Sequence, residues 1–230
     1  MKAVTTFFDV KRTCYNGLSF VRRGSVVAVI GLAAISPNYS LAGTMVSLTV
    51  RVFNYAQVSP PTLASAERDA NQILAAAGLR VDWLDCLQKA QTVRSKAVCE
   101  MGWSPELPSV RLLSGQVAER YQGLEFGFSS VPVLATINYE HIANRASRDN
   151  SSSETSTLLG CVIAHELGHL FLGSDSHSAV GIMQAHWGRG QIHQAQRGNL
   201  RFAPKQAVQL REKVRLLTDC QQGMFAKMMK

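Results

Sequence analysis

The chain lacks the features that mark membrane-spanning and nucleic-acid-binding proteins. Its longest apolar run near the start, residues 26–35, is too short to cross a bilayer as a helix. Although the 230 residues carry a net charge of +8, no basic stripe is interleaved with aromatic residues, and no internal repeat is visible. We therefore expect no permanent membrane insertion and no nucleic-acid partner. The length suits one domain, with a monomer as the expected state.

The first 42 residues differ in composition from the rest. Basic residues precede the apolar run, and Ser40-Leu41-Ala42 follows it with small residues at the two positions that signal peptidase reads. The pair Arg22-Arg23 also admits twin-arginine export, although the residues after it match that signal poorly. We predict a signal peptide at 1–42 and an exported, periplasmic or extracellular, domain at 43–230. That domain keeps 19 basic and 15 acidic residues, a net charge of +4.

Cysteine is scarce, with five in the chain and four after residue 42. An even number in an exported protein permits two disulfides. Cys86 and Cys99 would close a short loop and are the favoured pair. Cys161 with Cys220 is a possible second pair, and the alternative for Cys161 is a free thiol buried as a small hydrophobic side chain.

The spacing of apolar residues predicts an α/β (α+β) domain. Alternation over 47–53 predicts a strand, helical spacing over 62–77 predicts a helix, and 79–84 predicts a second strand parallel to the first. Shorter strands are predicted at 109–113 and 131–139. We expect a mixed, mostly parallel sheet of about four strands. Loops are predicted at 86–106, 122–130 and 174–201, and a final helix from Ala203-Pro204 to about Thr218.

Pro132 lies within the predicted strand 131–139 and lacks a backbone N–H. Proline is tolerated mainly at sheet edges, so this segment is predicted to be the edge strand. Unpaired backbone groups at an edge can hold an extended peptide by strand addition, and the alternative is an edge that loops cover.

Residues 155–172 are predicted to form a buried helix that carries an H-E-x-x-H motif. The residues from Leu158 to Ala164 are apolar on all sides, and Gly173 can end the helix in the left-handed conformation. His165 and His169 are four residues apart and so project from one helical face, with Glu166 beside them. Two imidazoles so placed predict a Zn²⁺ site, and Glu166 is the expected general base toward a zinc-activated water. The expected reaction is hydrolysis of peptide bonds.

The third metal ligand separates the zinc peptidase classes. After Asp175 the chain has no carboxylate until Glu212. A thermolysin-like site, which takes a Glu about twenty residues further on, has no candidate at that spacing. A ligand just beyond the helix end is what remains.

At this point the chain resembles the metzincins, whose pattern is H-E-x-x-H-x-x-G-x-x-H/D followed by a methionine turn beneath the metal. Gly181-Ile182-Met183 resembles that turn, and its distance from His165 is similar to the short spacing of the archaemetzincin branch. The resemblance implies a metzincin-like core over most of residues 46–218, with the zinc helix and a C-terminal helix. It also implies an antiparallel edge strand and a zinc metalloendopeptidase activity.

The spacing departs from the family pattern. The family glycine is expected at position 172, where the chain has Leu172 followed by Gly173. Strict spacing puts Asp175 at the metal, whereas a turn shifted downstream puts His177 there. We favour His177, because imidazole is a common third ligand on zinc, with Asp175 as the alternative.

Two other functions fit the same motif. The first is a non-catalytic zinc-binding protein of the same fold, against which Glu166 argues because zinc binding alone does not require that carboxylate. The second is a zinc hydrolase acting on a non-peptide amide or ester.

Overall fold

Five strands form one sheet in a computed structural model that describes residues 45–88, 92–115, 126–147 and 152–228. The predicted signal peptide lies outside these residues. The strands are β1 (Val46–Asn54), β2 (Leu79–Asp85), β3 (Ser109–Leu113), β4 (Gly127–Ser130) and β5 (Leu134–Asn138). Their order is β2-β1-β3-β5-β4, and all neighbouring pairs are parallel except β4 with β5. The predicted mixed, mostly parallel sheet with an antiparallel edge strand is confirmed, with five strands in place of about four.

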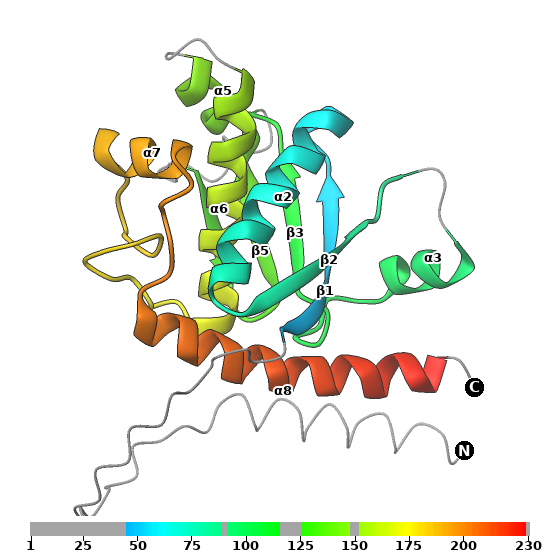
Figure 1. Cartoon of the computed structure of the whole chain (residues 1–230). Helices are drawn as coiled ribbons and strands as arrows, with labels where there is room; N and C mark the ends of the chain where they lie inside the picture. Colours follow the sequence, from blue (N-terminus) through cyan, green and yellow to red (C-terminus); the bar gives the residue numbers. More distant parts are fainter. Residues whose placement is uncertain (1–44, 89–91, 116–125, 148–151, 229–230) are drawn as a thin grey trace, which may run out of the picture.

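Helices lie against the sheet and at its ends (Figure 1). Two of them, α2 and α6, lie side by side on one face, and α8 runs across one end of the sheet. Between α2 and β1 the predicted apolar positions meet in one core, where Leu48, Val50 and Val52 are at most 2% exposed. The helices are α2 (Pro60–Ala76), α3 (Val93–Glu100), α5 (Tyr139–Ser147), α6 (Ser152–Leu172), α7 (Arg189–Gln196) and α8 (Pro204–Met228).

The prediction that residues 131–139 form the edge strand is wrong. β5 pairs with β3 on one side and with β4 on the other, so it lies inside the sheet. Pro132 precedes β5, in the turn after β4, where its missing N–H removes no ladder hydrogen bond. The edge strand is β4, which comes from the Gly- and Ser-rich segment that was predicted to be a loop.

The C-terminal helix α8 takes the place of a strand beside the first half of β1. β3 pairs with β1 only from Arg51 onward. Before that point the side-chain amide of Gln221 donates to the Thr49 carbonyl at 2.8 Å and accepts from the Thr49 N–H at 3.0 Å. The Thr218 hydroxyl donates to the Ser47 carbonyl. The helix therefore satisfies backbone groups that a strand would otherwise pair.

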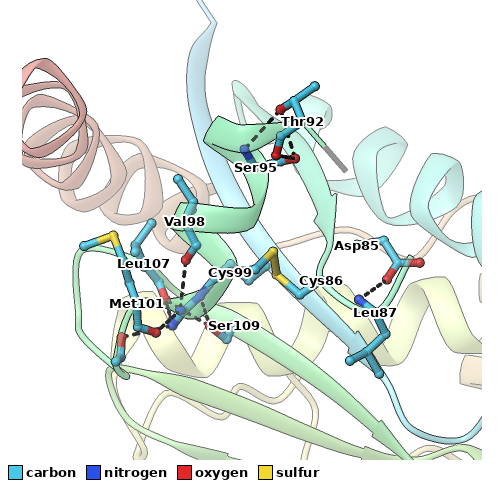
Figure 2. The surroundings of a disulfide bond; sticks show 12 residues. Asp85, Cys86, Leu87, Thr92, Ser95, Val98, Cys99, Met101, Leu107 and Ser109 are labelled. Carbon is cyan, nitrogen blue, oxygen red and sulfur yellow. Dashed lines mark hydrogen bonds between the residues drawn. A yellow bond between two sulfur atoms is a disulfide. The ribbon is translucent and has the colours of Figure 1, made fainter. Parts of the chain in front are cut away.

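The predicted Cys86–Cys99 disulfide is present and joins the end of β2 to α3 (Figure 2). The Cys161–Cys220 pair is wrong, because Cys161 is a free thiol, 2% exposed within α6. Burial raises the pKa of that thiol to about 12. The packing of α6 against the core thus keeps Cys161 as the small hydrophobic side chain of the alternative interpretation.

Arg51 organises the segment around the disulfide. Its side chain is fully buried and donates to the Ser109 hydroxyl and to four backbone carbonyls, at positions 98, 101, 102 and 107. Figure 2 shows the carbonyl-bearing residues Val98, Met101 and Leu107 beside the disulfide. Five hydrogen bonds match the five N–H groups of a guanidinium, so every donor has an acceptor.

Helix α6 is long and apolar enough to cross a membrane by composition alone. However, 78% of its most apolar window is buried inside the domain. The core helix of a globular domain has the same composition, because it is covered on all sides. Here α2, α5, α8 and the sheet supply that cover.

Candidate metal centre

The C-terminal half of α6 brings two imidazoles to the inside of the domain. Leu167 is fully buried and His169 is 7% exposed, while His165 is half-buried. The helix ends at Leu172, and Gly173 follows with φ +106°, a conformation that glycine adopts without steric cost. This turn directs the chain back toward the helix.

The structure brings His177 to the pair on α6. The Nε2 atom of His169 lies 3.1 Å from Nε2 of His165 and 3.1 Å from Nε2 of His177. Ligand atoms of all three residues lie within 4.8 Å of one another, and they form a group able to hold a metal ion. Among the described residues Asp175 is not in this group, and its side chain is exposed.

The hydrogen bonds of the two helical imidazoles fix which nitrogen carries the proton. Nδ1 of His165 lies 2.7 Å from the Ile182 carbonyl, which can only accept, so Nδ1 donates and Nε2 keeps its lone pair. Nδ1 of His169 lies 3.3 Å from the Gly173 carbonyl and 3.1 Å from the Ser176 hydroxyl. With Nδ1–H on both rings, two lone pairs face each other at 3.1 Å, which is repulsive unless a cation lies between them.

Two of the three nitrogen–nitrogen distances fit a tetrahedral ion. Zinc binds imidazole nitrogen at about 2.0–2.1 Å, which separates two ligands of a tetrahedron by about 3.3 Å. The observed 3.1 Å is close to that value. A backbone carbonyl behind a ligating ring is also the usual arrangement in protein metal sites.

Burial keeps the helical imidazoles neutral. It lowers the pKa of His165 to about 4, and the hydrogen bond to the Ile182 carbonyl opposes that shift. The pKa of His169 is also lowered by burial. Neutral imidazole is the form that binds a metal, so near pH 7 both rings are ready to do so.

Glu166 lies beside this group, at the junction of α6 and the edge strand. Its side chain is 4% exposed, and one carboxylate oxygen, Oε2, lies 2.7 Å from the Ser129 hydroxyl. That hydroxyl is also 3.0 Å from the backbone carbonyl of Glu166. Burial raises the pKa of Glu166 to about 7, and the Ser129 hydrogen bond opposes the rise. A carboxyl group with a pKa near neutrality can both take and return a proton.

Met183 packs beneath α6, against Gly168. It is fully buried, and a Cβ added at Gly168 would lie 2.5 Å from its sulfur atom. The neighbouring Ile182 donates its N–H to the Arg201 carbonyl and holds His165 through its own carbonyl. The Gly181-Ile182-Met183 turn therefore supports the histidine pair through contacts with His165 and Gly168.

A cavity of about 390 Å³ opens in front of the three histidines. The edge strand β4 forms one wall and the segment after Met183 forms the other. Trp187 contacts the His165 ring edge-on at 5.5 Å and donates its indole N–H to the Ile182 carbonyl. The lining residues are Phe126, Gly127, Phe128, Ser129, Val162, His165, Glu166, His169, Ser174, His177, Gln184, Ala185, His186 and Trp187.

Sequence reasoning did not identify Ser129 and Trp187 as site residues. Ser129 lies in a segment whose Gly and Ser content indicated a loop, so no periodicity placed it opposite Glu166. Trp187 is four residues after Met183, and only the turn between them aims its ring at His165. A polar residue on the edge strand nearest the motif is the signal that could have indicated Ser129.

The chain was compared with known families and proteins. It matches no family model and no curated protein.

Proposed function

We propose that this protein is an exported zinc-dependent metallopeptidase. The observation that carries the proposal is the convergence of three imidazole nitrogens in a cavity that also holds a buried carboxylate. Zinc held by His165, His169 and His177 would lower the pKa of a bound water to about 7 and polarise a carbonyl oxygen. The metal-ligand role of His177, in preference to Asp175, is part of the proposal.

Glu166 is the proposed general base. Its carboxylate lines the same cavity as the three histidines and is held by Ser129. We expect it to accept the proton of the attacking water and to deliver it to the leaving amine. The near-neutral pKa of Glu166 supports both transfers.

The edge strand supports a peptide substrate. The Asn138 N–H donates to the Phe126 carbonyl across the β4–β5 pair. Since antiparallel ladders alternate, the backbone groups of Gly127 and Ser129 then face away from β5, toward the open edge. Both residues line the cavity. An extended peptide could pair with these groups and pass in front of the histidines.

The architecture also supports the resemblance to metzincins. Helix α6 carries the motif, Met183 lies beneath it, and an antiparallel strand lies at the edge of the sheet. The disulfide is compatible with export. We also propose that residues 1–42 are removed, which leaves a domain with a net charge of +4. We expect this domain to be a monomer.

Replacing Glu166 with Ala tests the mechanism. The variant should bind zinc as the wild type does. It should hydrolyse casein or a quenched peptide about 10² to 10⁴-fold more slowly. His193→Ala is a suitable control, since His193 is exposed on α7 and belongs neither to the cavity lining nor to the ligand group. Unchanged hydrolysis in Glu166→Ala would refute the mechanism. No hydrolysis by wild-type zinc-loaded protein would favour the non-catalytic alternative, and turnover of esters alone would favour the non-peptide hydrolase.

The third ligand is tested by zinc content. His177→Ala should lose zinc on dialysis, whereas Asp175→Ala should retain it, because only His177 lies within reach of the other two rings. Loss of zinc in the Asp175 variant alone would reverse the assignment.

A further inference from the structure

The segment that carries His177 has the least regular structure of the metal centre. His165 and His169 lie on α6, whereas His177 is exposed and lies in a stretch outside helices and strands. Fixing each residue of such a stretch costs about 1–2 kcal/mol of conformational entropy. Something must hold this segment if the His177 ring is to stay at the other two.

Gln206, in the first turn of α8, contacts this segment on both sides of His177. Its side-chain Nε2 donates to the Ser176 carbonyl at 2.9 Å. Its Oε1 accepts from the Ala203 N–H at 3.3 Å and lies 3.5 Å from the Ser178 hydroxyl, which donates at 2.8 Å to the Val180 carbonyl. One half-buried amide thus joins the start of α8 to the residues before and after His177.

The residues that Gln206 holds also contact the rest of the centre. The Ser176 hydroxyl lies 3.1 Å from Nδ1 of His169, and the Ser178 N–H donates to the Met183 carbonyl. The 176–178 segment is therefore held against α6 and the methionine turn on one side and against α8 on the other.

We propose that Gln206 is a positioning residue that holds the 176–178 segment so that His177 stays within reach of the metal. This inference rests on the proposed metal-binding function of the site. Contacts of this kind, one step away from a ligand, typically change metal affinity 10- to 100-fold when they are lost. Gln206 touches no metal-ligand atom, so its effect must pass through the backbone on either side of His177.

The two ends of the amide can be tested separately. Oε1 accepts the Ala203 N–H at the start of α8, which is the helix-capping half of the contact. Gln206→Glu keeps that acceptor but replaces the donor by an oxygen that repels the Ser176 carbonyl. We expect this variant to retain the thermal stability of metal-free protein and to bind zinc about tenfold more weakly in competition with a chromophoric chelator. Gln209→Ala, an exposed position on the same helix, is the matched control and should bind zinc normally.

A double-mutant cycle shows whether the effect passes through His177. In a His177→Ala background, Gln206→Glu should weaken zinc binding less than twofold, because the group it positions is gone. An undiminished loss in that background, or wild-type affinity of Gln206→Glu, would overturn the proposal. Failure of the wild-type protein itself to bind zinc would instead refute the proposed function, and this inference with it.

Discussion

Two polar clusters lie on different sides of the domain, and they differ in how their hydrogen bonds are satisfied. Around Arg51, next to α3, five donors meet five acceptors. Around His169, at the end of α6, two acceptors face each other, since the Nε2 lone pairs of His165 and His169 lie 3.1 Å apart. In Figure 1 α3 and the segment that follows α6 lie on opposite sides of the domain.

This difference separates a structural cluster from a functional one. Burial lowers the pKa of Arg51, yet the guanidinium stays charged and its carbonyl acceptors compensate for the water it has lost. In the histidine cluster the facing Nε2 atoms of His165 and His169 do not form a donor–acceptor pair with each other. Polar groups without a partner in the protein are typical of sites where a ligand supplies that partner. The Arg51 cluster therefore indicates a structural role, whereas the histidine cluster indicates a binding site.

Removing Arg51 should have the largest effect on stability. Arg51→Met leaves four carbonyls without this donor, of which those of Val98 and Leu107 are buried, and each buried unpaired group costs about 1–3 kcal/mol. We expect the free energy of unfolding in urea to fall by about 4 kcal/mol, with zinc affinity of the folded protein unchanged. Arg80→Met, at an exposed arginine of β2, is the control and should change stability little. A stable Arg51→Met protein would break the contrast between the clusters.

Removing the disulfide should have the next largest effect. Cys86 and Cys99 are 13 residues apart, and a loop of that size gives about 3 kcal/mol of stabilisation, chiefly by restricting the unfolded chain. The double variant Cys86→Ser/Cys99→Ser should therefore unfold at a lower urea concentration than the wild type. A difference below 1 kcal/mol would mean that Arg51 alone holds this region.

Zinc should stabilise the histidine side only. Free zinc at 100 times its dissociation constant should add about 2.7 kcal/mol to the free energy of unfolding. His169→Ala should abolish that increment, since it removes the nitrogen nearest both other rings. Arg51→Met should retain the full increment on its lower baseline. An increment that survives in His169→Ala would place the metal elsewhere.

The smallest effect is expected beneath the metal centre. A Cβ at Gly168 would lie 2.5 Å from the Met183 sulfur and 2.9 Å from a ring carbon of Phe202. Overpacking of this kind costs about 1–3 kcal/mol, so Gly168→Ala should lower the melting temperature. Gly190→Ala, on α7 with open space around it, should be neutral or slightly stabilising. Equal behaviour of the two alanine variants would show that Met183 yields to the extra methyl group.

Much of the fold follows from local patterns. β1, α2 and β2 were predicted because their buried residues repeat with the period of each element. The start of α8 was predicted at Pro204, but the helix continues to Met228 beyond the expected Thr218. Its last turns are held by tertiary contacts of Gln221 and Met224, which a sequence pattern does not show.

Elements that depend on tertiary contacts were missed. α3 lies inside a segment that was predicted to be a loop. It shows no helical pattern of apolar residues, because it buries only Val98 and is anchored by the disulfide and Arg51. α7 also lies in a predicted loop, with Ile192 and Ala195 as its buried residues. β4 has no apolar alternation, because Gly127 and Ser129 face Glu166 and the cavity. Apolar periodicity does not reveal a segment whose residues contribute to a binding site or to a disulfide instead of the core.

For the candidate site, the sequence located the histidine pair and Glu166 from their spacing alone. It left Asp175 and His177 as alternatives, because the length of the turn after Leu172 decides between them. The fold brings His177 to the pair. Ser129 and Gln206 come from distant segments, and only the sheet and α8 bring them to the site.

The contacts of Thr218 and Gln221 with β1 have a consequence for self-association. They occupy backbone groups on the side of β1 where β3 has not yet begun. Without α8, residues 47 and 49 would offer the donors and acceptors of an open strand in the middle of a sheet. Unpaired backbone N–H and C=O groups of this kind can pair with a strand from another molecule, as the edges of sheets do in aggregating proteins. The last helix is therefore a barrier to aggregation as well as a packing element.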